Sequence, residues 1–144
     1  EKNGCTASAE FIIKEKVLPE LTATRLASGE PIRMEKIQFD ADSIVIKPEA
    51  VPSIDELYEF LYDNPTIIIE VSGHTNSLPA DDYCDRISTA RAKSVADYLI
   101  NKGIESRRVI FIGHGKRKPI APNQTPEGRK KNQRVEIRLI KIEE

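Results

Sequence analysis

The chain has 144 residues, a common size for a single compact domain. Its 22 Lys and Arg residues nearly balance its 23 Asp and Glu residues, which excludes the strong single-sign field that draws proteins to nucleic acids or anionic membranes. The apolar runs are only a few residues long, far short of the roughly 20 residues that a membrane-spanning helix needs.

The beginning of the chain is patterned differently from the rest. Residues 1–30 show neither a long helical period nor a clean alternation, so we expect a linker or the remnant of a preceding domain there. A single domain should occupy residues 31–144. The two cysteines, Cys5 and Cys84, form no CxxC motif, and the sequence leaves open whether they form a disulfide.

A first strand is predicted from Ile32 to Phe39, where apolar residues recur with a slip near Lys36. This strand should end in the turn-prone residues 40–43. The domain is therefore expected to begin with an extended segment.

A helix should follow, because Ser53 and Glu56 have the spacing of a capping box and apolar residues then recur at helical intervals. Asn64-Pro65 should end it. The next run, residues 66–72, is rich in Ile and Val and predicts a strand that is covered on both faces and ends at Gly73.

The second half of the chain predicts two helices and two strands. A long helix should begin near the acids of residues 82–85 and end at Gly103. A strand is predicted over residues 109–112, Thr125 should cap a short helix, and the alternation in residues 134–139 indicates a final strand. The order β-α-β-α-β-(α)-β predicts an α/β sandwich with one mixed four-stranded sheet and helices packed on one face.

Polar side chains follow the ends of the predicted strands. Asp40 follows the first strand, His74-Thr75-Asn76 the second and His114 the third, while the long helix supplies Ser88 and Arg91 near its start. In a domain with one sheet and one helix layer, these side chains could line a single edge. A guanidinium held there matches a carboxylate through two parallel hydrogen bonds.

Several motifs agree in order with one protein family over about residues 37–140. They are Phe39-Asp40, Asn64-Pro65, Gly73-His74-Thr75-Asn76, Ile87-Ser88-Thr89-Ala90-Arg91-Ala92, Tyr98-Leu99, Gly103-Ile104, Gly113-His114-Gly115, Pro119-Ile120-Ala121, Asn123-Gln124-Thr125 and Gly128 to Ile137. With these motifs the sequence resembles the OmpA-like peptidoglycan-binding domain of outer-membrane anchors, peptidoglycan-associated lipoproteins and flagellar stator proteins.

The resemblance implies a non-catalytic module, without cofactor or metal, that binds the diaminopimelate of a peptidoglycan stem peptide and anchors an envelope assembly to the cell wall. In this family the Arg at the position of Arg91 takes the ligand's carboxylate, and an Asp after Gly-His-Thr takes its ammonium. Here that Asp is replaced by Asn76, and Cys84 replaces a usual Asn beside the same loop. We therefore expect one of Asp81, Asp82, Asp85 and Asp40 to restore the missing negative charge, with Asp40 favoured and Asp85 next.

The expected ligand-binding set comprises Phe39, Asp40, Thr75, Asn76, Asp85, Ser88, Arg91, Asn132 and Arg134. Of these, Asn132 and Arg134 should orient the edge of the site. By the same resemblance we expect a periplasmic location, associated with the outer membrane of a Gram-negative bacterium. The expected partners are peptidoglycan and other envelope proteins, with no nucleic acid.

Other functions stay open on the residues alone. The departures at Asn76 and Cys84 also suit a protein-protein interaction module that kept the fold and weakened or lost the ligand. A hydrolase using Cys84 and His74, or a metal site that adds His114, is less favoured because no HxxxH or CxxC spacing supports it. The basic run at residues 129–134 lacks the interleaved aromatic residues of a nucleic-acid surface.

Overall fold

The computed structural model describes residues 29–40, 42–76 and 81–142. Most of the expected linker, and Cys5, lie outside these residues. The elements are β2 (Ile32–Arg33), η1 (Pro48–Ala50), α2 (Val51–Asp63), β3 (Ile67–His74), α3 (Asp81–Lys102), η2 (Ser106–Arg108), β4 (Val109–Gly113), α4 (Pro126–Asn132) and β5 (Arg134–Ile142).

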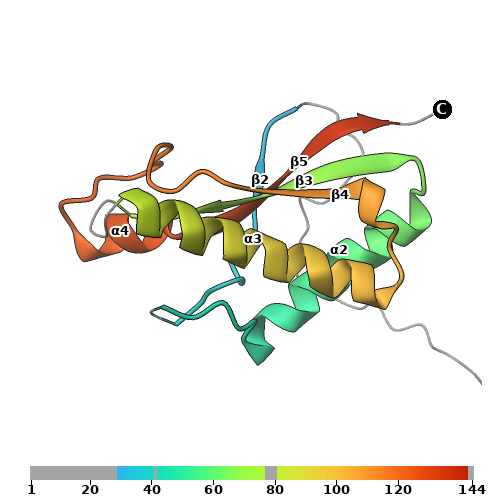
Figure 1. The fold of residues 1–144 in the computed structure, drawn as a ribbon, viewed down its shortest axis with the longest axis horizontal. Helices are drawn as coiled ribbons and strands as arrows, with labels where there is room; N and C mark the ends of the chain where they lie inside the picture. The colour runs from blue at the N-terminus through green and yellow to red at the C-terminus, as the bar shows by residue number, and fades with distance from the viewer. Residues whose placement is uncertain (1–28, 41, 77–80, 143–144) are drawn as a thin grey trace, which may run out of the picture.

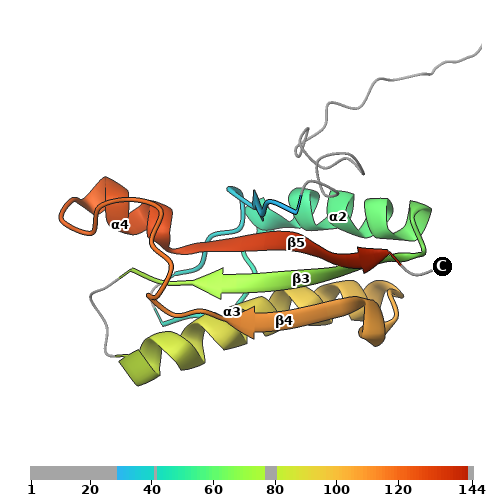
Figure 2. The same ribbon diagram turned by 90° about the horizontal axis from the view of Figure 1, so that it is seen from above.

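The four strands form one mixed sheet in the order β2-β5-β3-β4. β3 pairs parallel with β4 and antiparallel with β5, and β5 pairs antiparallel with β2. Helices α2 and α3 cover the same face of this sheet, as the two views show (Figures 1 and 2). The predicted α/β sandwich, with its mixed four-stranded sheet, is confirmed.

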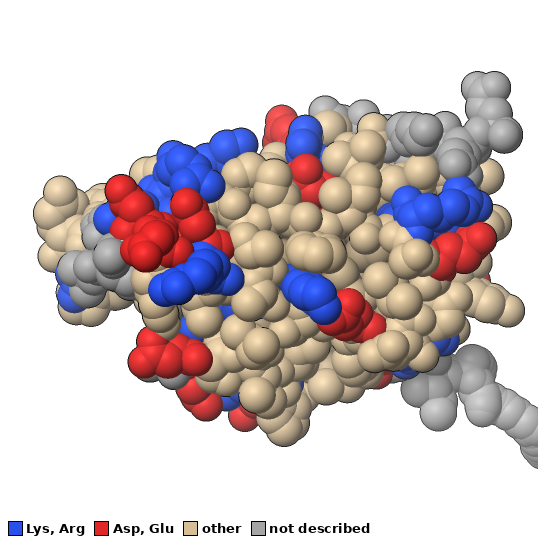
Figure 3. Space-filling view, viewed as in Figure 1, with Lys and Arg blue, Asp and Glu red and all other residues tan. Residues whose placement is uncertain are grey.

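The surface over α3 carries charges of both signs. Figure 3 shows Lys and Arg side chains interspersed with Asp and Glu side chains on this face, without a broad area of one sign. A charged ligand on this face would therefore have to be recognised by individual side chains. Within the described residues, no helix is both long and apolar enough to cross a membrane.

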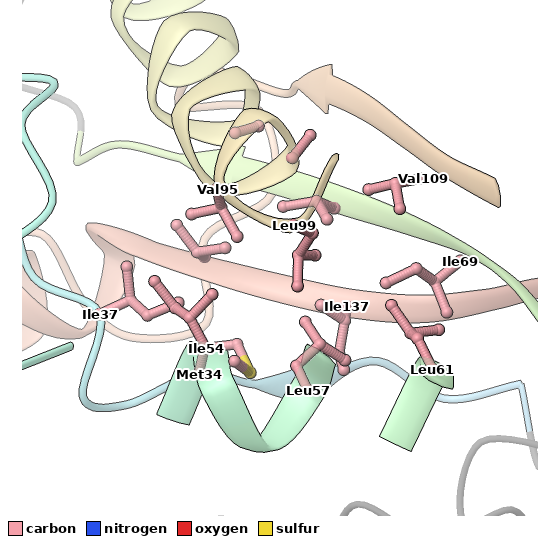
Figure 4. Packing of buried hydrophobic residues seen from close by; sticks show 14 of the residues in the cluster. Met34, Ile37, Ile54, Leu57, Leu61, Ile69, Val95, Leu99, Val109 and Ile137 are labelled. Atoms are coloured by element: carbon pink, nitrogen blue, oxygen red, sulfur yellow. The ribbon is translucent and has the colours of Figure 1, made fainter. Parts of the chain in front are cut away.

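The core lies between the sheet and the two long helices (Figure 4). It is built from fully or nearly fully buried apolar side chains, including Met34, Ile37, Ile54, Leu57, Leu61, Ile69, Val71, Val95, Leu99, Val109 and Ile137. Each large apolar side chain that is removed from water contributes about 1.5 to 3 kcal/mol, so this layer is the main source of stability.

Two predicted elements differ from the structure, the first in its end and the second in its start. The first strand is only Ile32–Arg33, because the chain turns after it and the Ile37 amide donates to the Met34 carbonyl at 3.0 Å. The predicted capping box is wrong: the Ser53 hydroxyl donates to the Ala50 carbonyl at 2.9 Å, and α2 already begins at Val51. A proline in the first turn suits that start, because its missing N–H would have no helical partner there.

The remaining boundaries lie close to prediction. Gly103 has φ +124° and follows the last residue of α3, in a backbone conformation that glycine adopts without the steric cost of a side chain. The Thr125 hydroxyl accepts a hydrogen bond from the Gly128 amide at 3.0 Å and caps α4, as predicted.

Candidate ligand-binding site

The first half of α3 lies directly against the ends of β3 and β4. A Cβ atom on Gly73 would lie 2.2 Å from the Ser88 carbonyl oxygen, and one on Gly113 would lie 2.2 Å from the Thr89 hydroxyl. The two glycines are register partners in the parallel pair. Their missing side chains allow the close contact that brings the helix to the strand ends, where the polar motifs collect.

Arg91 leaves this part of α3 and is 8% exposed. Its Nε donates to the Ser43 carbonyl at 2.9 Å, and its Nη2 donates to the Asp40 carbonyl at 3.0 Å. The guanidinium carbon lies 5.1 Å from the centre of the half-buried Phe39 ring. The guanidinium thus holds the turn at residues 40–43 against the helix by hydrogen bonds and a cation–π contact.

Burial lowers the pKa of Arg91, while the charges of Tyr83 and Asp42 act in the opposite direction. Arginine stays protonated in proteins despite such a shift. Among the described residues, no acceptor is found for its Nη1. A small cavity beside the guanidinium is lined in part by Phe39, His74 and Arg134.

The two acids that we expect first to restore the missing negative charge, Asp40 and Asp85, each form an ion pair with a cationic side chain. The Asp40 carboxylate is 76% exposed and lies 3.2 Å from the Lys47 ammonium. The Asp85 carboxylate is 46% exposed and lies 2.6 Å from the Arg117 guanidinium. Asp40 meets Arg91 through its backbone carbonyl, and its carboxylate is paired with the lysine.

The strand end after Gly73 is buried beside the start of α3. The Thr75 amide donates to the Gly115 carbonyl at 2.8 Å, and the Thr75 hydroxyl donates to the Asn76 carbonyl at 3.1 Å. The Cys84 thiol lies 3.8 Å from that same carbonyl. Asn76 is therefore placed next to α3, as expected, while the Thr75 hydroxyl bonds within the chain.

Ser88 is fully buried and organises the neighbouring loop. Its hydroxyl accepts from the Gly115 amide at 3.0 Å and donates to the Asp85 carbonyl at 3.2 Å. The Ser88 hydroxyl therefore fixes the start of the loop that follows β4.

Asn132, at the end of α4, is also fully buried. Its side-chain oxygen accepts from the amides of Ile120 and Ala121 at 2.7 and 3.0 Å, and its amide donates to the Ala121 carbonyl and to the Asn123 side chain. Through these hydrogen bonds, Asn132 orders the loop that follows β4. An orienting role of Asn132 at the ligand site stays a prediction.

Arg134 belongs to a buried polar network on β3 and β5. Its Nε lies 2.7 Å from the Glu136 carboxylate, whose other oxygen lies 3.5 Å from His74 Nε2. Burial alone would raise the pKa of Glu136, but hydrogen bonds from His74 and Arg134 outweigh it and hold that pKa at about 2. Arg134 also donates to the Lys118 carbonyl at 2.8 Å.

The histidines are arranged as a stacked pair. The His74 and His114 rings lie 5.0 Å apart, and burial together with the charge of His74 lowers the pKa of His114. His74 Nε2 faces Ser72 and Glu136, whereas the Cys84 thiol contacts the Asn76 carbonyl. No hydrogen bond joins Cys84 and His74 in the described structure. The same residues contain no group of three or more His, Cys, Asp and Glu side chains that could hold a metal.

The structure thus brings Phe39, Asp40 and Arg91 into direct contact. The contacts described above for Thr75, Asn76 and Ser88 are instead with Gly115 and with Cys84 and Asp85 in the first turns of α3. The structure also adds a pair that the sequence did not suggest, because the Tyr83 hydroxyl donates to the Asp42 carboxylate next to Arg91. No periodicity or motif marks this pair. Only the turn propensity of an aspartate at position 42 gives a weak signal.

Comparisons with known proteins show which family the chain resembles. Outer membrane protein A of Bordetella avium is 40% identical over 104 residues, which cover 71% of this chain and 53% of that protein. The peptidoglycan-binding protein ArfA of Mycobacterium bovis is 35% identical over 116 residues, covering 81% of this chain and 34% of that protein. The chain therefore spans about half or less of the length of these two relatives.

Among solved structures, the cell wall anchor of the T6SS from Pseudomonas aeruginosa superposes with a TM-score of 0.64 at 30% identity, over 74% of this chain and 76% of that chain. The model of the OmpA family matches residues 38–133, which is more than half of the sequence and includes the turn at residues 40–43, Arg91 and Asn132. The protein belongs to the OmpA family.

Proposed function

We propose that this domain binds the stem peptide of peptidoglycan without altering it, and so anchors an envelope assembly to the cell wall. The observation that carries the proposal is the Arg91 guanidinium, which is buried, fixed by two backbone carbonyls and placed where the family motifs converge. Its planar fork suits the carboxylate of diaminopimelate, with Phe39 packed against the group.

The names of relatives support the same role, because one is a peptidoglycan-binding protein and one solved structure is a cell wall anchor. Relatives named as outer-membrane proteins support a periplasmic location, associated with the outer membrane. We further propose that residues 31–144 form the binding domain and that the residues before them connect it to other parts of the assembly.

A non-catalytic role fits the side chains best placed for chemistry. His74 contacts Ser72 and Glu136, and the Cys84 thiol is buried against a backbone carbonyl. Neither arrangement forms the nucleophile and base pair that a hydrolase needs. Intact recovery of muropeptides after incubation with the domain is the expected result, and their cleavage would contradict it.

The test of binding is cosedimentation with sacculi that contain diaminopimelate, using Arg91→Lys as the informative variant. Lysine keeps the charge but cannot form the paired fork contact, so we expect at least a tenfold loss of affinity. Arg86→Lys is the matched control, because Arg86 is exposed on the same helix. Free diaminopimelate should compete with the sacculi. Equal binding by Arg91→Lys and the wild type would contradict the assigned role.

A protein interaction module remains the second candidate, and one observation favours it. β4 lies at the edge of the sheet and leaves Ile110, Phe111 and Ile112 between 38% and 45% exposed, without the charged side chains that usually guard an edge strand. Ile112→Lys should reduce capture of envelope proteins and leave sacculus binding intact, if both roles exist.

A further inference from the structure

A separate groove lies on the face of the sheet opposite α2 and α3. Glu70, Ser72 and His74 alternate along β3 with residues of the core, so their side chains point away from the two helices. In the register of β3 and β5, Glu136 lies opposite Ser72, and Arg138 lies opposite Glu70. These five residues line a groove with a volume of about 300 Å³.

The two acids of this groove each pair with an arginine, so neither sign of charge dominates it. Glu70 Oε1 lies 3.3 Å from the Arg138 guanidinium, and the Glu136 carboxylate lies 2.7 Å from Arg134. A ligand with a full charge of either sign would meet a like charge from one member of each pair. The groove therefore suits a ligand that is recognised mainly by hydrogen bonds.

Three side chains of the groove have donors or acceptors that are open to such a ligand. Lys118 is exposed, and none of the described acids forms an ion pair with its ammonium. Arg138 contacts Oε1 of Glu70, and no described group bonds to the other oxygen of that carboxylate. The His114 ring stacks on His74, and burial together with the charge of His74 lowers the pKa of His114. A neutral imidazole both donates and accepts a hydrogen bond.

The shape and the lining of the groove fit a sugar ring. Two ring-shaped side chains, Pro31 and His114, line it beside the polar groups. A pyranose presents C–H groups on its faces and hydroxyl groups around its edge, so its site needs apolar contact together with placed donors and acceptors. The volume of about 300 Å³ lies at the lower end of the range for small-molecule sites, about 300 to 1,000 Å³.

We propose that this groove binds an N-acetylated sugar of the glycan strand to which the stem peptides are attached. Glu70 accepts from a sugar hydroxyl, while Lys118 and His114 contact hydroxyl and acetamido oxygens. The choice of a cell wall sugar rests on the proposed function, whereas the chemistry of the groove does not. His74 lines both this groove and the small cavity beside Arg91, so the two sites adjoin and one polymer can occupy both.

The test is an NMR titration of the isotopically labelled 144-residue chain with tetra-N-acetylchitotetraose, an N-acetylated sugar that carries no peptide. Amide signals of residues 70–74 and 110–118 should shift, with a Kd on the order of 1 mM. Cellotetraose has the same ring and linkage without acetamido groups. It should bind about fivefold more weakly, because one hydrogen-bond acceptor is lost.

Matched variants locate the effect. Lys118→Ala and Glu70→Gln should each weaken the binding of tetra-N-acetylchitotetraose about fivefold, because one removes a donor and the other removes the charge of an acceptor. Lys93→Ala and Glu59→Gln are the controls, because both side chains are exposed on helices that cover the opposite face. Arg91→Lys should bind this sugar like the wild type, which separates the groove from the site for the diaminopimelate carboxylate. Thermal unfolding of each variant checks that the fold is intact.

The outcomes separate the groove from the proposed stem-peptide site. Wild-type sugar affinity in both Lys118→Ala and Glu70→Gln overturns the inference, as do signal shifts that lie away from the groove. Equal binding of cellotetraose overturns the assignment to an N-acetylated sugar. If free diaminopimelate competes with sacculi and the sugar is not bound, the groove assignment alone is wrong. If the sugar is bound and diaminopimelate does not compete, the groove is supported and the stem-peptide site is contradicted.

Discussion

The buried carboxylate of Glu136 predicts how the domain responds to acid. Its pKa is lowered from 4.5 to about 2, because hydrogen bonds from His74 and Arg134 outweigh the effect of burial. At about 1.4 kcal/mol for each pH unit, this difference corresponds to roughly 3 kcal/mol of stability. The side chain is only 13% exposed, so solvent screens the interaction weakly.

The sign follows from the direction of the shift. A carboxyl group whose pKa is lower in the folded state binds fewer protons there than in the unfolded chain. Its contribution is complete above about pH 4.5 and is lost as the pH falls towards 2. The free energy of unfolding of the wild type should therefore decline across this range.

Urea unfolding at intervals between pH 2 and pH 6 measures this contribution. Glu136→Gln should be less stable at pH 6 by roughly 3 kcal/mol and should lose less stability than the wild type as the pH falls. Glu105→Gln is the control, because that acid is exposed and pairs only across a surface contact with Arg107. Parallel pH curves for the wild type and Glu136→Gln would refute the reasoning.

Three further substitutions test the packing that supports the site. Gly113→Ala should cost about 1 to 3 kcal/mol in urea unfolding, since its Cβ would overlap the Thr89 hydroxyl and amide. Asn132→Ala should cost at least about 2 kcal/mol and raise protease cleavage within residues 118–125, because backbone groups of that loop lose their partners. Arg108→Met should cost about 2 to 3 kcal/mol, since the buried guanidinium donates to three carbonyls at the end of α2 and the start of β3.

The long periodic elements were predictable because their side chains carry the signal of burial. α3 ends at Lys102, directly before Gly103, and β5 alternates as expected, since one face of each element packs against the core. The first strand was predicted too long. Its apolar residues, Met34 and Ile37, are buried by a turn instead of a strand, and burial alone does not distinguish the two.

The sequence motifs singled out some of the residues at the candidate site. Arg91 was singled out by its motif, and the structure places it against Phe39 and the carbonyls of Asp40 and Ser43, while its contact with a ligand stays a prediction. The direction of each carboxylate in the turn at residues 40–43 was not predictable, because it depends on the positive φ of Asp42 and on a tyrosine 41 residues away in the sequence.

Two hydrogen bonds join Arg91 to the segment that follows Phe39. Arg91 donates to the carbonyls of Asp40 and Ser43, which precede and follow Asp42 in the sequence. Backbone carbonyls of two residues therefore hold the guanidinium in place. The proposed contact of Arg91 with a ligand carboxylate thus relies on groups other than the side chain at position 76.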